Sequence, residues 1–94
     1  KAAVISMTRS LALSVATESI RVNAVCPGSI DSEMFDRTLV STDPEAERKM
    51  MIGLHPLGRL GKPIEVAEAV VFLASPAAAY VTGVCLPVDG GRLA

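Results

Sequence analysis

The sequence has 94 residues, half of them hydrophobic, with nine basic and ten acidic side chains and a formal net charge of −1 at pH 7. This balance excludes a strongly basic nucleic-acid surface, and one Tyr, two Phe and no Trp leave few platforms for base stacking. No apolar run reaches the roughly 18 residues of a membrane span. We therefore expect a protein that binds neither nucleic acid nor a membrane.

The chain opens with a long apolar segment, residues 2–17, which contains no Gly or Pro and is predicted to be a helix. Its short polar residues Ser6, Ser10 and Ser14 follow one another at helical spacing, and most of the remaining circumference is apolar. Such a helix must be buried on more than one side. The second partner is either a neighbouring helix of the same chain or the same helix of another subunit, and the pattern favours both equally.

A short apolar run with β-branched members follows, and it predicts a buried parallel strand from Ile20 to Cys26. Pro27 then removes a backbone donor, and Gly28 lets a ligand or another backbone approach closely. Ligands of open α/β sheets bind at the carboxyl ends of the strands. Residues 27–32 are therefore the predicted ligand-binding edge.

Residues 33–55 are polar and uneven, and we interpret them as a substrate lid that leaves this edge. Asp43 and Pro44 indicate the start of a short helix, and Arg48 and Lys49 late in it suit the helix dipole. Methionines scattered among the charges would make the lid adaptable. Plain packing of these methionines against the sheet is the alternative.

A turn-rich connector, residues 56–62, leads to a second strongly apolar helix. This helix is predicted to begin at Pro63 and to stop before Ser75, with Glu65 and Glu68 on its exposed line.

A second buried strand is predicted from Val84 to Val88. Pro87 lacks a ladder donor, which places this strand at the edge of the sheet. The order helix, strand, lid, helix, strand gives one right-handed crossover between parallel strands, preceded by an extra helix. The fold class is α/β, and two strands are too little sheet to cover these helices. We therefore expect a piece of a longer domain.

Single residues add little chemistry by themselves. Cys26 and Cys85 lie in apolar runs and are predicted to be small buried hydrophobes with free thiols, as in a reducing compartment. His55, the only imidazole, is predicted to be structural. The glycines do not have the spacing of a phosphate-binding loop, and no metal-ligand cluster is present, so no bound metal is expected.

A series of short motifs nevertheless runs through the chain in a specific order. They are Lys1-Ala2-Ala3, Ile20-Arg21-Val22-Asn23-Ala24-Val25, Pro27-Gly28-Ser29-Ile30, Pro56-Leu57-Gly58-Arg59, Pro63 with Val66-Ala67, Phe72-Leu73-Ala74-Ser75, Val81-Thr82-Gly83 and Val88-Asp89-Gly90-Gly91. Each is weak alone, but together they resemble the carboxyl-terminal part of a short-chain dehydrogenase/reductase. The resemblance implies that residues 1–94 form the carboxyl-terminal portion of a single NAD(P)-binding Rossmann domain, a doubly wound parallel sheet.

The resemblance also implies a site. Lys1 would be the last residue of the family's Tyr-x-x-x-Lys motif, a catalytic residue that binds the nicotinamide ribose and lowers the pKa of the proton-transferring Tyr. Pro27 and Gly28 would line the nicotinamide, and the backbone of Ile30 would bind its carboxamide. Ser32 stands where the family usually has Thr, whose hydroxyl bonds the cofactor.

Three further positions match the family without implying catalysis. Asn23 and Asp89 correspond to structural residues. Arg59 is expected to anchor its loop, with a charged substrate as the alternative partner.

The activity implied by the resemblance is an NAD- or NADP-dependent oxidoreductase that interconverts a carbonyl and an alcohol and is similar to 3-oxoacyl-acyl-carrier-protein reductases. It also implies a cytoplasmic homo-oligomer, a dimer or tetramer, assembled through the long first helix and the last helix and strand. The alternative is a non-catalytic oligomerisation or binding module that has kept the scaffold. The sequence fixes neither the substrate nor the choice between NAD and NADP.

Overall fold

The computed structural model describes residues 1–94 and has the α/β architecture predicted from the sequence. Its elements, with short 3-10 helices written η, are α1 (Ala2–Val15), η1 (Ala16–Glu18), β1 (Ala24–Pro27), α2 (Glu33–Thr38), α3 (Pro44–Gly53), α4 (Pro63–Ala74), η2 (Pro76–Ala78) and β2 (Cys85–Val88). The two strands pair in parallel, with Ala24 opposite Cys85 and Pro27 opposite Val88. The helix α4 connects them, which gives the predicted parallel β–α–β unit.

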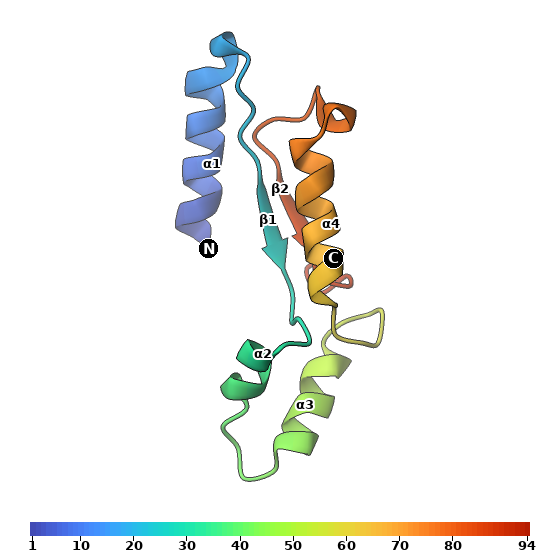
Figure 1. The fold of residues 1–94 in the computed structure, drawn as a ribbon. Coiled ribbons are helices and arrows are strands. Elements are labelled where there is room, and N and C mark those ends of the chain that lie inside the picture. Colours follow the sequence, from blue (N-terminus) through green and yellow to red (C-terminus); the bar gives the residue numbers. More distant parts are fainter.

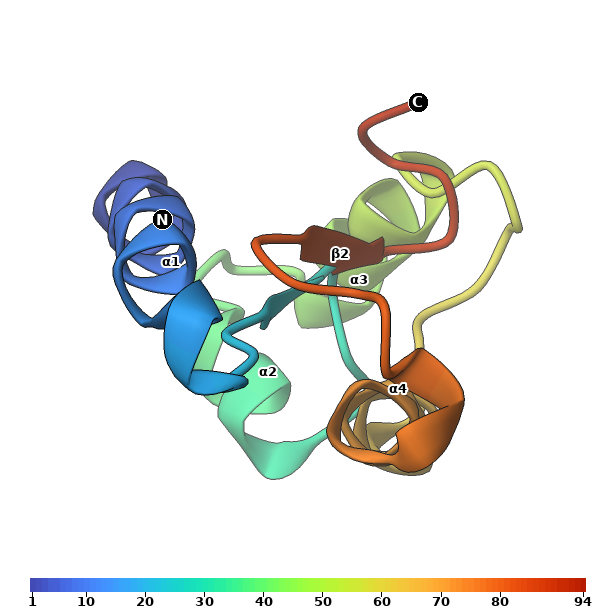
Figure 2. The same cartoon turned by 90° about the horizontal axis from the view of Figure 1, so that it is seen from above.

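Helices flank the strands on two sides (Figures 1 and 2). α1 packs against β1, and α4 packs against both strands. α2 and α3 lie beyond the carboxyl ends of the strands, which extends the molecule to 53 Å along one axis against 25 and 24 Å along the others (Figure 1). The segment predicted to be a lid therefore lies at the end of the sheet where ligands of such folds bind.

The two long helices have the predicted positions. α1 and η1 together span residues 2–18, and the chain leaves them through Ser19, whose left-handed backbone (φ 59°) ends the helical path. α4 begins at Pro63 and is followed by Ser75 in extended conformation, as predicted. Glu65 differs from its prediction as an exposed residue: it is half-buried, and its carboxylate accepts the backbone N–H of Lys62 at 2.9 Å.

β1 starts later than predicted, at Ala24 rather than Ile20. The cause is Asn23, whose side chain occupies the space between the strands. Its Nδ2 donates to the Val81 carbonyl at 3.0 Å, and its Oδ1 accepts the Val84 N–H at 3.0 Å. The Val84 N–H thus pairs with a side chain instead of the backbone, although the Gly83 N–H still donates to the Val22 carbonyl at 2.8 Å, and β2 begins one residue later than predicted, at Cys85.

α2 is absent from the sequence-based prediction. Ser32 caps it, because its hydroxyl accepts the Phe35 N–H at 3.2 Å, and Phe35 is the buried residue of the helix. α3 begins as predicted, with Asp43 as its cap and Pro44 as its first residue. The segment 33–55 therefore holds two short helices rather than one.

The core is thin. Only eight residues are buried: Thr8, Ala12, Cys26, Phe35, His55, Leu60, Leu73 and Ala78. The prediction that β1 is buried on both faces is therefore wrong within these residues, because Cys26 alone is buried while its neighbours are half-buried. Cys85 is also half-buried, and both cysteines are free thiols.

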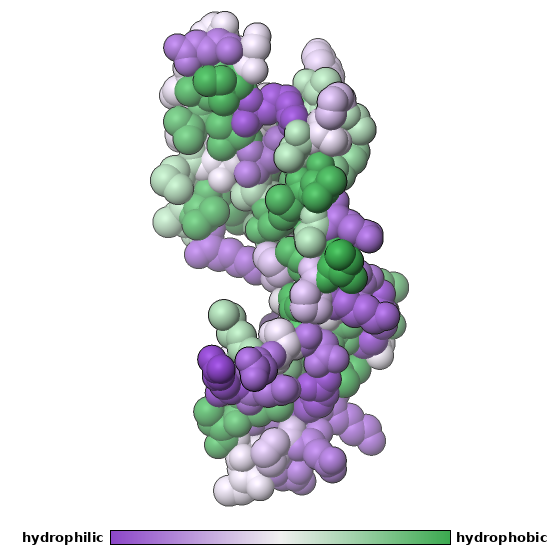
Figure 3. Space-filling view, viewed as in Figure 1, coloured by the Kyte–Doolittle hydropathy of each residue, from purple (hydrophilic) through white to green (hydrophobic).

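Much apolar surface is left uncovered. On α1, Met7 is 64% exposed and Leu13 82%, and on α4, Val71 is 66% exposed. Figure 3 shows these apolar areas over the upper part of the molecule, whereas the α2–α3 end is mostly polar. None of the helices combines the length and the hydropathy that crossing a membrane requires.

Candidate functional site

Lys1 lies beside the carboxyl end of β1. Although 26 positions separate the two residues, Lys1 Nζ donates a hydrogen bond to the Pro27 carbonyl at 3.3 Å. Lys1, Pro27 and Gly28 share a hollow of about 310 Å³, which Asp89 and Met51 also line. The structure thus brings together three of the five residues predicted to form the site, and Figure 3 shows a notch in the surface between the start of α1 and the α2–α3 end.

Gly28 is required by the packing of the chain itself. A Cβ atom at this position would lie 2.9 Å from both Cα and Cβ of Asp89 and 3.1 Å from Nε2 of His55. Of the two expected reasons for a glycine here, close approach of another backbone is therefore the one that the structure shows.

His55 stabilises the bend at Pro27–Ser29, which we call the corner after β1. It is 3% exposed; its Nε2 accepts the Ser29 N–H at 3.2 Å, and its Nδ1 lies 2.8 Å from the Met51 carbonyl. Because Nε2 accepts, Nδ1 carries the proton of the neutral ring. Both ring nitrogens are engaged, so the imidazole holds the loop after β1 against the end of α3, which is the structural role predicted for it.

Asp89 turns the chain after β2. Its carboxylate accepts the N–H of Gly91 at 3.0 Å and that of Leu93 at 3.3 Å. Like Asn23, it has the structural role that the sequence indicated.

Ile30 lies on the other side of the corner. Together with His55 and Arg59 it lines a second hollow of about 300 Å³. An isolated parallel bridge joins it to Gly61, and a Cβ on Gly61 would lie 2.8 Å from Ile30 Cδ1, so the Ile30 side chain is packed over that glycine. The Ile30 N–H makes no hydrogen bond within the chain. A free backbone donor is therefore present at the edge where a ligand is expected.

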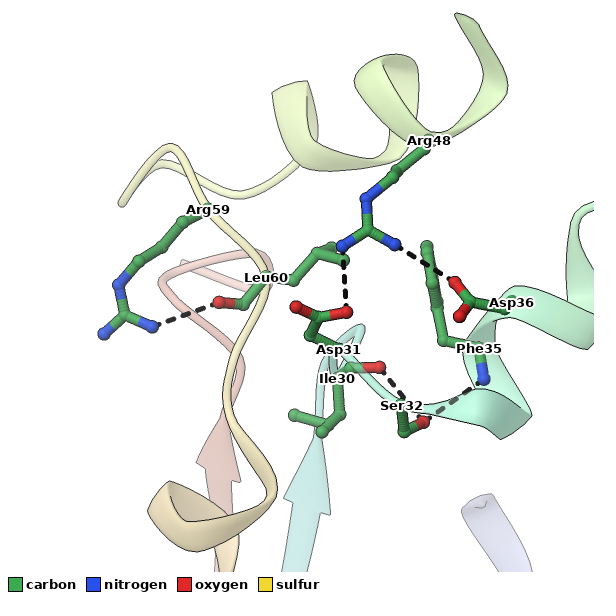
Figure 4. Close-up of polar contacts among 8 residues, drawn as sticks. All are labelled: Ile30, Asp31, Ser32, Phe35, Asp36, Arg48, Arg59 and Leu60. Atoms are coloured by element: carbon green, nitrogen blue, oxygen red, sulfur yellow. Dashed lines mark hydrogen bonds and ion pairs between the residues drawn. The ribbon is translucent and has the colours of Figure 1, made fainter. Parts of the chain in front are cut away.

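Ser32 lines neither of these hollows. Its hydroxyl accepts the Phe35 N–H and donates to the Ile30 carbonyl at 3.3 Å (Figure 4). A hydroxyl has one donor and two acceptor positions, so one acceptor position remains open.

An arginine of α3 lies at the centre of a cluster that sequence reasoning missed (Figure 4). Arg48 Nη2 contacts Asp31 Oδ1 at 2.8 Å, and Arg48 Nη1 contacts Asp36 Oδ1 at 3.1 Å. The guanidinium also lies over the Phe35 ring, with 5.6 Å between Cζ and the ring centroid. The hydrogen bond to Asp31 raises the pKa of Arg48 above its ordinary value. We call Arg48, Asp31, Asp36 and Phe35 the Arg48 cluster.

Arg59 anchors its loop, as predicted. Its guanidinium forms two bonds with the Glu65 carboxylate, at 2.7 and 2.8 Å, and a third with the Leu60 carbonyl at 3.0 Å. The bonds from Arg59, followed by that from the Lys62 N–H, lower the pKa of Glu65 to about 2. Arg59 is therefore already neutralised by a residue of its own chain.

The other candidate groups lie apart from this edge. Tyr80, the only tyrosine, follows η2 at the far end of α4 and is fully exposed. The structure contains no group of three or more His, Cys, Asp or Glu side chains arranged to hold a metal ion. What the edge offers is an exposed ammonium, a free N–H and carbonyl oxygens, which suit a ligand rich in hydroxyl and amide groups.

Comparisons with known proteins match nearly the whole chain. The sequence profile of the family described as Enoyl-(Acyl carrier protein) reductase matches residues 1–92. A 3-oxoacyl-(acyl-carrier-protein) reductase of Pseudomonas aeruginosa is 52% identical over 91 residues, which are 97% of this chain and 35% of that protein. A protein of Xanthobacter autotrophicus named "Inactive 2-(S)-hydroxypropyl-CoM dehydrogenase 2" is 45% identical over 100% of this chain and 41% of its own length.

A solved structure agrees with these matches. The crystal structure of a short chain dehydrogenase family protein from Francisella tularensis superposes with a TM-score of 0.92 and 37% identity, covering 99% of this chain and 41% of that one. The chain thus spans between a third and just over two fifths of the length of these relatives.

Proposed function

Because the chain belongs to the short-chain dehydrogenase/reductase family, we propose that it is the carboxyl-terminal part of the NAD(P)-binding domain of an oxidoreductase that interconverts a carbonyl and an alcohol. The observation that carries the proposal is the contact between Lys1 Nζ and the Pro27 carbonyl, 3.3 Å long. It joins the residue that matches the family's lysine to the edge that matches its nicotinamide site.

The residues at this edge fit a nicotinamide dinucleotide, which when bound supplies or accepts a hydride. Lys1 is exposed and can donate to ribose hydroxyls. The Ile30 N–H, free of any partner in the chain, suits a carboxamide oxygen. Pro27 and Gly28 present backbone with little side-chain bulk, so a flat ring can approach.

Ser32 enters this proposal with one restriction. Its hydrogen is directed to the Ile30 carbonyl and one acceptor position is used by the Phe35 N–H. The hydroxyl can therefore accept a bond from the cofactor through its remaining lone pair, or it can donate after releasing Ile30.

We assign Lys1 to catalysis on electrostatic grounds. An ammonium close to a phenol favours the phenolate, so the proton of an adjacent Tyr moves more readily to or from a substrate oxygen. That Tyr belongs to the family motif that ends at Lys1. In this proposal, therefore, Lys1 assists the proton transfer that this Tyr carries out.

The lid interpretation of residues 33–55 belongs to the same proposal. α2 and α3 lie beyond the carboxyl ends of β1 and β2, where a substrate would meet the nicotinamide (Figure 1). The lid exposes Met34 to 75% and Met50 to 63%. Flexible apolar side chains of this kind suit an aliphatic substrate, such as a 3-oxoacyl thioester.

We further propose that the protein is a cytoplasmic homo-oligomer. The uncovered apolar faces of α1 and α4 need a partner, and both the family resemblance and the two-sided apolar pattern of α1 are consistent with a second subunit. Light scattering on the protein at its full natural length measures the assembly directly.

A second candidate function is a binding or oligomerisation module without catalysis. The specific observation in its favour is the relative named inactive, which matches this chain along its entire length at 45% identity. A protein with a similar sequence over this length is thus named as inactive, which supports a module of this kind as the second candidate.

Titration with NADH and NADPH, followed by assays on ketones and 3-oxoacyl thioesters, tests the proposal in the full-length protein. We expect Lys1→Met to lower kcat/KM by at least about 100-fold, the contribution of assisted proton transfer, together with weaker dinucleotide binding. Lys49→Met, which removes an exposed lysine of α3, is the matched control. Full activity of Lys1→Met would contradict the proposal, and a lack of dinucleotide binding by the unaltered protein would favour the module.

A further inference from the structure

The Arg48 cluster connects the lid to the segment proposed to bind the cofactor. Asp31 lies between Ile30 and Ser32 in the sequence, and its own N–H donates to the Gly61 carbonyl at 2.8 Å. Its carboxylate accepts from Arg48 of α3 at 2.8 Å. Asp31 is thus fixed through its backbone to the connector and through its side chain to the lid.

Arg48 holds α2 through two different interactions. One nitrogen of its guanidinium bonds Asp36 at 3.1 Å, and its plane lies over the buried ring of Phe35. The Arg48 side chain is 33% exposed, so the charge is partly removed from water while both carboxylates remain more than half exposed. The planar fork of arginine can bond two carboxylates and stack on a ring at the same time, which a lysine cannot do.

We propose that Arg48 is a positioning residue, which keeps α2 and α3 docked on the loop after β1 and so sets the positions of the Ile30 N–H and the Ser32 hydroxyl. This inference rests on the proposed function and deepens it, because it assigns cofactor affinity to a residue outside the cofactor edge. Arg48 acts through Asp31 and Phe35.

The experiment compares Arg48→Gln with Arg37→Gln in the full-length protein. Arg37 is the matched control because it belongs to the same lid, its side chain is 78% exposed, and its ion pair is with Glu33 of the same helix, at 3.7 Å. We expect Arg48→Gln to raise the KM and the dissociation constant for NADH or NADPH, whichever binds, by about tenfold. We expect kcat to change less than about twofold, because the lost interaction serves binding and not the chemical step. Arg37→Gln should leave all three unchanged.

Hydrogen exchange gives a readout that does not depend on activity. In Arg48→Gln the amides of residues 30–38 should exchange faster than in the unaltered protein, and in Arg37→Gln they should not. Arg48→Lys should recover part of the affinity, since it keeps the charge but loses the fork. In the unaltered protein, raising the salt concentration should weaken dinucleotide binding more than in Arg48→Gln, because salt screens exposed ion pairs.

Unchanged exchange in Arg48→Gln would overturn the inference. Faster exchange with unchanged dinucleotide affinity would also overturn it, since the lid would then move without effect on the cofactor loop. If the unaltered protein binds no dinucleotide, the proposed function fails and the cofactor part of the inference fails with it. Faster exchange in Arg48→Gln alone would then still support the link between lid and loop.

Discussion

The residues at the corner after β1 pack closely against one another. Gly28 leaves room for Asp89, His55 takes up the hydrogen bond of Ser29, and Asp89 folds the chain back by accepting two N–H groups. Few of these contacts involve a charged pair, so the shape of the corner depends on close packing more than on electrostatics. His55 and Asp89 thus hold the backbone at the proposed ligand edge in place.

Adding one methyl group to this corner should be costly. We expect Gly28→Ala to lower the free energy of unfolding by about 1–3 kcal/mol, since its Cβ would lie 2.9 Å from the Asp89 backbone. Gly53→Ala, at the end of α3 where nothing lies within 4 Å of the added Cβ, is the control and should be stabilising by about 0.5–1 kcal/mol. Urea unfolding of the full-length protein measures both, and equal effects of the two substitutions would contradict the packing argument.

At the level of single residues, the sequence indicated the bend at Pro27-Gly28 and the structural roles of His55 and Asp89, but not the Arg48 cluster. The Pro27-Gly28 corner follows from the strand pattern, and Lys1 follows from the family motif. The Arg48 cluster could not be found in the same way, because its members lie on three separate segments whose approach depends on the folded lid. Ser32 does carry a local signal, because a serine cap followed by an acidic residue, here Glu33, is typical of a helix start.

At the level of elements, the predictions were most accurate where helices have strong end signals. α4 starts at a proline and ends before Ser75, so its bounds follow from the sequence alone. β1 and β2 are shorter than predicted at the point where the Asn23 side chain, rather than a backbone carbonyl, accepts the Val84 N–H. Hydrophobic pattern cannot reveal such a substitution, since Val22 and Val84 keep the apolar character of a strand.

The free energy of unfolding should depend on pH through the carboxylate of Glu65, in the first turn of α4. Its pKa is lowered from 4.5 to about 2 by Arg59 and the Lys62 N–H, so the folded state binds this proton more weakly than the unfolded state. The resulting stabilisation is fully present above pH 4.5 and is lost as the pH falls toward 2. We therefore expect Glu65→Gln to be less stable than the unaltered protein near pH 6.5, with the difference narrowing below pH 4.5.

Urea unfolding at several pH values between 6.5 and 3 measures this narrowing. Glu68→Gln, which removes a carboxylate without an ion-pair partner from the same helix, is the control for the loss of one negative charge. A difference for Glu65→Gln that does not vary with pH would contradict the role assigned to its pair with Arg59.

On the scale of the whole molecule, residues 1–94 form an elongated structure with a small core. Their radius of gyration is 15.8 Å, whereas a compact domain of this length has about 12 Å. The difference comes from the elongated shape, 53 Å along one axis against 25 and 24 Å along the others, and it agrees with the small number of buried residues. The sequence indicated this result, because two strands cannot cover two strongly apolar helices, but it did not reveal which side of each helix stays open.

Residues 1–94 by themselves should therefore not unfold cooperatively. The buried apolar area is too small to offset the chain entropy that folding costs. We expect differential scanning calorimetry to show no sharp transition and NADH to have no effect on the profile. A sharp transition that rises in temperature with added NADH would contradict this prediction.

The bridge between Ile30 and Gly61 joins the two ends of the segment that contains α2 and α3. The Asp31 N–H donates to the Gly61 carbonyl at 2.8 Å, and the Gly61 N–H donates to the Ser29 carbonyl at 3.0 Å. The two stems of the lid, residues 29–31 and Gly61, are therefore joined just beyond the sheet. Everything between the stems is a closed loop, and lengthening a closed loop costs little free energy. On the proposal that residues 33–55 cover the substrate, exchange of this segment for another should alter the substrate range while the register of β1 and β2 stays as it is.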